Sequence, residues 1–172
     1  APVVNVDLPN VVNLSLDDAK KLIERNGLVV GTIEYVESEL NKKDIVISQD
    51  PAANVVGAQA GKGTAVNLKV GSGEKTNKFA LKIPLPKDFA YQYGTLSYWV
   101  NNGSTKEGES SELDFYSGSD YTFNIATKDA QIDILIKISA KGSNTYENYV
   151  SFKIDCKTGS ILETKTHSYS KK

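Results

Sequence analysis

Residues 8–27 read LPNVVNLSLDDAKKLIERNG, and this stretch decides the fold of the first part of the chain. Pro9 has no backbone N–H and favours extended geometry in the residue before it. Ser15 is a good N-cap with Asp18 three residues later, and Gly27 supplies a left-handed end. The pattern predicts a helix between Ser15 and Gly27. Its apolar face consists of Leu16, Ala19, Leu22 and Ile23.

Three strand patterns follow this helix. They run from Leu28 to Val36, where Gly31 interrupts the pattern, from Asp44 to Ser48, and from Thr64 to Val70. One helix and three short strands suit a minimal two-layer core. We therefore expect a three-stranded antiparallel sheet that is covered on one face by the helix.

The second part of the chain shows strand patterns without a helix signal. Residues 71–77 are small and polar and predict a linker. About seven strands follow over roughly 95 residues, which predicts an immunoglobulin-like β-sandwich. The expected strands are Phe79–Pro84, Thr95–Val100, Glu112–Tyr116, Tyr121–Ala126, Ile132–Ile138, Val150–Cys156 and Ile161–Thr166. The dipeptide Asn102-Gly103 predicts a tight turn.

Three single residues in this part carry expectations of their own. Trp99 is expected to fill the core. Cys156, the only cysteine, is expected to be a small buried residue on a strand, and it excludes an internal disulfide. His167, the only histidine, is expected to be a solvated side chain in the terminal tail.

Composition sets limits on function. The 172 residues are 40% hydrophobic and 24% charged with a net charge of −1, which is ordinary for a globular protein and gives no basic field for nucleic acid or anionic lipid. No apolar run approaches the roughly 18 residues of a membrane span. The chain begins Ala1-Pro2-Val3 and contains no methionine, so we expect a piece of a longer protein.

Three motifs together resemble the PASTA domain of bacterial cell-wall kinases and penicillin-binding proteins. They are residues 8–19, the Gln-x-Pro strand exit in residues 47–52, and the closing strand in residues 63–70, in family order. Asn54 stands at a turn where the family usually has glycine, and residues 55–61 lengthen the loop that follows. The expected fold is multidomain, α+β and all-β. It has a PASTA domain at 1–70, a linker at 71–77, and an immunoglobulin-like β-sandwich domain at 78–172.

The setting of the domain also follows from resemblance. The run Ile83–Asp88 behind a PASTA module resembles a junction in Firmicutes Ser/Thr kinases of the PrkC type, whose extracellular arm ends in a β-sandwich. This implies an extracellular sensor on the cell-wall face of a membrane-anchored kinase. Its implied partners are peptidoglycan fragments (muropeptides) or β-lactams, with self-association of the full-length receptor. Neither nucleic acid nor direct membrane contact is expected.

Candidate ligand-binding residues are Glu34, Tyr35, Gln49 and Lys62, which carry acidic, polar, amide and basic groups suited to a stem peptide. A role without a ligand fits each of the four at least as well, as a solvated surface side chain or, for Gln49, as part of a structural Gln-x-Pro turn. No catalytic residue, cofactor or metal site is expected, because nucleophile-elbow, Ser-x-x-Lys and kinase-loop motifs are absent from the sequence. Two alternatives stay open, namely a structural spacer or adhesion element without a small ligand, and the C-terminal appendage of a penicillin-binding protein.

Overall fold

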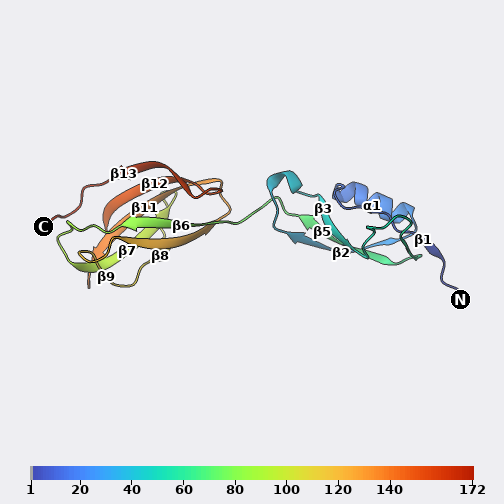
Figure 1. Ribbon diagram of the computed structural model, residues 1–172, viewed down its shortest axis with the longest axis horizontal. Coiled ribbons are helices and arrows are strands. Elements are labelled where there is room, and N and C mark those ends of the chain that lie inside the picture. The colour runs from blue at the N-terminus through green and yellow to red at the C-terminus, as the bar shows by residue number, and fades with distance from the viewer. Residues whose placement is uncertain (1) are drawn as a thin grey trace. The chain divides into compact units, whose positions relative to one another are not determined.

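The computed structural model describes residues 2–172 in two compact units, with the division between Lys75 and Thr76 (Figure 1). The described residues are mostly β-structure with one α-helix. The first unit contains β1 (Asn5–Asp7), α1 (Leu16–Arg25), β2 (Val29–Val36), a 3₁₀ turn η1 (Leu40–Lys42), β3 (Val46–Asp50), β4 (Gln59–Gly61) and β5 (Ala65–Gly71). The second contains β6 (Asn77–Pro84), β7 (Tyr93–Val100), β8 (Gly108–Glu109), β9 (Leu113–Asp114), β10 (Asp120–Thr127), β11 (Gln131–Ala140), β12 (Glu147–Asp155) and β13 (Ser160–Thr166).

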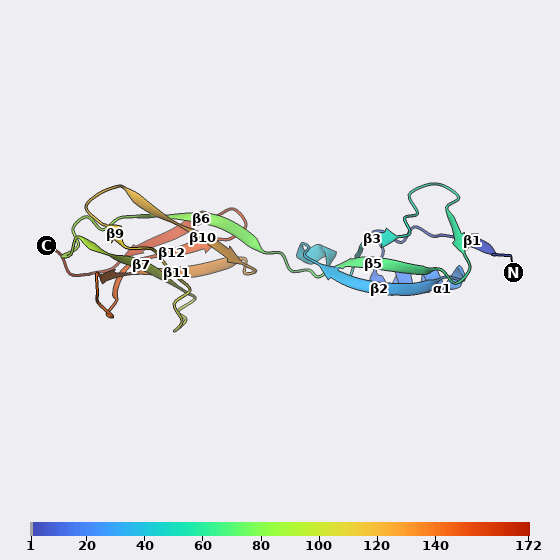
Figure 2. The same cartoon turned by 90° about the horizontal axis from the view of Figure 1, so that it is seen from below.

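The helix α1 begins and ends where its sequence predicts. Ser15 is the N-cap, and its Oγ accepts a hydrogen bond from the backbone N–H of Asp18 at 3.1 Å. Gly27 follows the helix in the left-handed conformation, with a φ of 76°. Ala19 and Ile23 are fully buried against one face of the sheet (Figure 2). The helix is therefore held by its caps and by one apolar face.

The three-stranded sheet is mixed, so the prediction of an antiparallel sheet is wrong. Its order is β2-β5-β3, in which β5 runs antiparallel to β3 but parallel to β2. The last strand, β5, takes the central place, and its Val66, Leu68 and Val70 are all buried. Hydrophobic alternation shows which face of a strand is buried but gives neither its direction nor its neighbours.

Gly31 interrupts β2 with a bulge. The register between β2 and β5 shifts between Val30 and Ile33, and the Asn67 Oδ1 accepts a hydrogen bond from the Thr32 backbone N–H at 2.9 Å. A Cβ atom on Gly31 would lie 2.2 Å from this oxygen. The bulge therefore depends on a glycine here and on an amide across from it.

The loop after the Gln-x-Pro exit differs from expectation. Asn54 does not supply the left-handed turn position, which falls instead on Gly57 with a φ of 77°. Within the lengthened loop, Gln59–Gly61 forms β4, which pairs with β1. The Leu8 backbone N–H also donates to the Ala58 carbonyl at 2.8 Å. The extra residues thus form backbone hydrogen bonds with the opening segment of the chain. Turn propensities describe only neighbouring residues, so they do not predict these contacts between segments distant in sequence.

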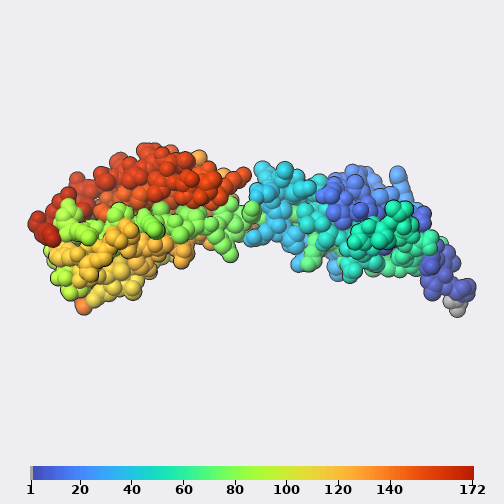
Figure 3. Space-filling model, viewed as in Figure 1, coloured from blue at the N-terminus to red at the C-terminus, as the bar shows by residue number. Residues whose placement is uncertain are grey.

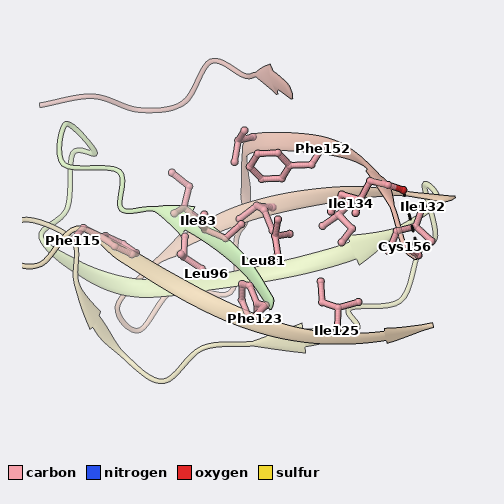
Figure 4. Close-up of a cluster of buried hydrophobic side chains, with 14 of the residues drawn as sticks. Leu81, Ile83, Leu96, Phe115, Phe123, Ile125, Ile132, Ile134, Phe152 and Cys156 are labelled. Carbon is pink, nitrogen blue, oxygen red and sulfur yellow. Dashed lines mark hydrogen bonds between the residues drawn. The ribbon is translucent and has the colours of Figure 1, made fainter. Parts of the chain in front are cut away.

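Two sheets enclose one core in the second unit. β6 pairs with β10, whereas β13, β12, β11, β7 and β8 form a larger sheet in that order, with β9 also on β7. The predicted strand at 112–116 shortens to β9, because Phe115 leaves the strand and is fully buried in the core. The core draws side chains from both sheets (Figure 4), including Leu81, Ile83, Leu96, Phe123, Ile125, Ile132, Ile134 and Phe152.

Trp99 does not fill this core, contrary to the prediction. It is only 8% exposed, but it lies on the strand position between Tyr98 and Val100, whose side chains pack on the core. Its side chain therefore lies on the outer face of the larger sheet. There the Tyr146 ring packs at 5.3 Å between centroids, and the Lys137 Nζ lies 4.3 Å from the Trp99 ring centroid. Tyr146 and Lys137 thus cover Trp99 on the outer face.

The turn after β7 and the position of Cys156 both differ slightly from the prediction. The tight turn after β7 is centred on Asn101 and Asn102, both at positive φ, and Gly103 N–H closes it on the Val100 carbonyl at 2.8 Å. The turn thus lies one residue earlier than predicted. Cys156 is buried in the core at 1% exposure, as expected, but in the turn directly after β12 rather than on the strand.

Candidate functional site

Gln49 joins three backbone segments of the first unit. Its Oε1 accepts a hydrogen bond from the Val11 N–H at 2.8 Å. Its Nε2 donates to the carbonyls of Pro9 and Pro51, both at 3.1 Å. Both ends of the amide are thus engaged within the chain. Gln49 ties the opening segment to the turn after β3, and a ligand would have to displace these bonds to reach it.

Glu34 lies on the sheet face away from α1 and pairs with Lys69. The two residues are opposite in the register of β2 and β5, with Lys69 Nζ 3.8 Å from Glu34 Oε2. Their side chains are 65% and 57% exposed, respectively. Lys69 was not singled out from the sequence. Its alternation with the buried Leu68 and Val70 carried the signal, because it places Lys69 on the open face.

Tyr35 points to the other face, since neighbouring strand residues alternate. Its hydroxyl donates to Asp44 Oδ1 at 3.3 Å. Desolvation, followed by the Asp44 carboxylate, raises the pKa of Tyr35 above its ordinary value. Tyr35 and Glu34 therefore cannot contact the same small ligand.

Lys62 lies at the opposite end of β2 from Tyr35. It follows β4, its backbone N–H donates to the Val4 carbonyl at 2.7 Å, and its side chain passes beside Gly27, just before β2 begins. Val29 and Tyr35 are six positions apart in β2, which corresponds to about 20 Å of strand. The structure thus does not bring the four predicted residues together into one cluster.

The open face around Glu34 and Lys69 is polar. Ser48 lies opposite Lys69, and Asp50 lies opposite Asn67, in the register of β3 and β5. Exposed Ile47 precedes Ser48 and supplies apolar surface. An exposed ion pair contributes only about 0–1 kcal/mol to stability. The Glu34–Lys69 pair can therefore separate at small cost, which frees Glu34 to bind an amine of a ligand and Lys69 to bind a carboxylate.

Hollows that the sequence did not indicate occur on the surface of the second unit. One of about 230 Å³ lies on the outer face of the larger sheet and includes Leu135 and Ser151. His167, expected to be solvated, is half-buried beside it with Nε2 3.1 Å from Ser151 Oγ. Another of about 450 Å³ lies beside the C-terminal tail and includes Tyr91. Within residues 2–172 no group of three or more His, Cys, Asp or Glu side chains is placed to hold a metal ion.

Comparison with known families identifies the first unit. The family model described as the PASTA domain matches residues 6–72. This segment is a PASTA domain. The predicted PASTA assignment is confirmed, and the open face that carries Glu34 and Lys69 belongs to this PASTA domain.

The PASTA-containing chain is similar to kinase sequences. It is 29% identical over 79 residues to a probable serine/threonine-protein kinase of Clostridium perfringens (strain 13 / Type A), a match that covers 46% of this chain and 11% of that protein. The solved structure of the entire extracellular region of the Ser/Thr kinase PrkC from Staphylococcus aureus matches at 18% identity and a TM-score of 0.32. That match covers 85% of this chain and 51% of the solved chain. The chain thus spans a small part of its curated relative. No helix in residues 2–172 has the length and apolar character to cross a membrane.

Proposed function

We propose that this chain is a non-catalytic, extracellular sensor segment of a bacterial membrane Ser/Thr kinase, and that its PASTA domain recognises peptidoglycan fragments on the cell-wall face. The PASTA domain and the similarity to a probable serine/threonine-protein kinase support this setting. Muropeptides are the proposed ligand, and β-lactams share the carboxylate that such a site would bind. Engagement of ligand by full-length receptors would raise the local concentration of their kinase domains.

The observation that carries the proposal is the exposed Glu34–Lys69 pair on the open face of the PASTA sheet. A stem peptide carries carboxylates and, in some species, a free amine. Lys69 would bind a carboxylate and Glu34 an amine, while Ser48 offers a hydroxyl opposite Lys69. The other three residues do not contact the ligand in this proposal. Tyr35 is hydrogen-bonded to Asp44, Gln49 joins backbone segments, and Lys62 is a solvated side chain.

We also propose that the second unit is an immunoglobulin-like sandwich. Its strand pairing supports this assignment, because β6 pairs with β10 in one sheet while β7, β11 and β12 pair in the other. Strands that are consecutive in sequence, β6 and β7, thus lie in different sheets, as Greek-key sandwiches require. In this proposal the sandwich is part of the extracellular arm.

Titration of the PASTA domain with a muropeptide, followed by amide NMR shifts, tests the ligand. We expect shifts at Glu34, Ser48 and Lys69, and a loss of affinity of about tenfold in each of Glu34→Lys and Lys69→Glu. Lys21→Glu, on exposed helix surface, is the matched control and should bind as wild type. Absence of shifts on the open face at millimolar ligand would overturn the proposal.

A structural spacer is the second candidate. Its support is that Gln49 is engaged at both ends and that the four residues selected from the sequence are not gathered together. In that case muropeptide shifts no residue of the PASTA domain, and Gln49 variants change stability alone. An appendage of a penicillin-binding protein would be distinguished by a transpeptidase domain, rather than a kinase domain, elsewhere in the same gene.

A further inference from the structure

The two edges of the larger sheet in the second unit differ in length. β8 and β9 lie at one edge and have two residues each. β13 lies at the other edge, and its seven residues, Ser160–Thr166, include no proline. Natural sheets protect their edges with very short strands, proline or other devices, because a long unpaired edge pairs readily with another chain. The edge at β8 and β9 is thus protected by its shortness, whereas β13 has a bulge at Leu162 and two charged side chains but is long enough to pair.

β13 is exposed along its whole length. All of its residues are exposed, including the large apolar side chains of Ile161 at 48% and Leu162 at 51%. One side of the strand pairs with β12, and no strand within residues 2–172 pairs with the other side. The strand follows the margin of its unit in Figure 1, and the C-terminal part of the chain, in red, covers this margin in Figure 3. The backbone groups on that side are left to water or to another chain.

The charges on β13 are arranged symmetrically around Thr164. Glu163 and Lys165 flank it, and their register partners on β12 are Lys153 and Ser151. Both side chains therefore share the outer face of the sheet, while Thr164 lies on the inner face. When two such strands pair antiparallel with Thr164 opposite itself, each Glu163 lies directly opposite a Lys165.

We propose that β13 pairs antiparallel with β13 of a second copy of this chain, around a twofold axis through Thr164. The contact is isologous, so both copies use the same strand. The outer face then carries a row of alternating charge: Lys153, Glu163, and Lys165 of the second copy. Opposite charges across strands stabilise pairing and like charges oppose it. A register centred on Glu163 or on Lys165 places like charges together, so the charges select the register centred on Thr164.

The pairing is weak by its size. A seven-residue edge buries much less than the roughly 1,000 Å² of a stable interface. It forms when the copies are concentrated, as they are when tethered to one surface. The proposal uses residues of the second unit alone and does not depend on whether the PASTA domain binds a muropeptide.

A cysteine placed on the twofold axis tests the register. In Thr164→Cys the two new thiols lie on directly opposite residues, with Cα atoms about 4.5–5.5 Å apart, within the span of a disulfide. Thr166→Cys is the matched control, because its two copies lie four positions apart in this register, or roughly 14 Å. The wild-type protein controls for Cys156, which is 1% exposed.

We expect Thr164→Cys to form covalent dimers under mild oxidation at least about tenfold faster than Thr166→Cys or wild type, because only its thiols meet. The full chain is used, and circular dichroism checks that each variant is folded. Equal rates for the two cysteine variants would overturn the register. Failure of both to dimerise at high protein concentration would overturn the pairing itself.

Charge reversal in the Thr164→Cys background gives a second test. Adding Glu163→Lys creates lysine pairs across the axis, and adding Lys165→Glu creates glutamate pairs, so each variant alone should dimerise more slowly than Thr164→Cys by about tenfold. In a mixture of the two variants, every lysine faces a glutamate in the mixed dimer, and its rate should return to that of Thr164→Cys. Lys157→Glu, in the exposed turn before β13, controls for net charge. A mixture that fails to recover overturns the charge pairing.

Discussion

Asp88 accepts a hydrogen bond from the hydroxyl of Tyr169, a residue 81 positions later in the chain. The same carboxylate contacts Lys171 Nζ at 2.8 Å. A backbone bridge between Phe89 and Lys171 lies beside them. These contacts hold the C-terminal tail against the segment that follows β6. Lys171, followed by Tyr169, holds the pKa of Asp88 below its ordinary value of 3.8.

The contribution of the tail to stability should therefore be lost in acid. Because the pKa of Asp88 is depressed in the folded state, its stabilisation is present above 3.8 and is lost as the pH falls through the lower folded-state pKa. Asp88→Asn should unfold at a lower temperature than wild type at neutral pH, and the difference should shrink as the pH falls towards about 2. Thermal unfolding followed across this range checks it. Asp133→Asn is the control, and a difference for Asp88→Asn that stays constant with pH would contradict the prediction.

Gln49→Ala should destabilise the PASTA domain by about 1–3 kcal/mol, because the backbone partners of its amide lose their hydrogen bonds in a partly buried place. Chemical denaturation of both variants measures this. Gln59→Ala, at an exposed position of β4, should stay within about 0.5 kcal/mol of wild type. Equal stabilities of the two variants would show that the Gln49 clamp is not needed.

Tyr146→Ala should uncover the only tryptophan of the chain. The Tyr146 ring packs on Trp99 on the outer face of the larger sheet. Its removal should increase quenching of Trp99 fluorescence by acrylamide and shift the emission to longer wavelength. Tyr91→Ala is the control, since Tyr91 packs on Phe89 instead. Unchanged quenching in Tyr146→Ala would mean that other side chains cover Trp99.

Gly94→Ala should destabilise the second unit by about 1–3 kcal/mol, because its new methyl group overpacks a closed space. A Cβ atom there would lie 2.1 Å from the backbone oxygen of Ser139 and 2.9 Å from the Phe115 ring. Gly61→Ala is the control, as its nearest neighbour is the flexible side chain of Val3 at 3.1 Å. Denaturant midpoints measured for both variants and for wild type check this prediction. A Gly94→Ala protein as stable as wild type would contradict it.

The sequence predicts local structure, such as helix ends, better than it predicts which strands pair. The helix could be predicted because Ser15 and Gly27 act on their own neighbours. The direction of β2 could not, because it depends on which strand takes the centre of the sheet. β4 was missed for the same reason, since its partner β1 lies more than fifty positions away in sequence. Contacts distant in sequence leave little trace in periodicity.

The candidate site shows the same division. The sequence pointed to Glu34 by its polarity, but its partner Lys69 emerged only once the register of β2 and β5 was known. Trp99 illustrates the opposite error, because its size favoured the core while its position between Tyr98 and Val100 assigned it to the outer face. Strand alternation was the better guide in both cases.

The attachment of the tail to Asp88 has a mechanical consequence. β6 begins at Asn77, and the tail is fastened beyond the other end of this strand. A tension applied between Asn77 and the tail is therefore carried by the covalent backbone of β6 and by the contacts of Asp88 with the tail, before it reaches the eight residue pairs that join β6 to β10. Because hydrogen bonds in an antiparallel pair are perpendicular to the strands, those pairs are loaded together in shear only after the tail contacts have opened. The attachment of the tail thus shields the β6–β10 pairs when the second unit is stretched.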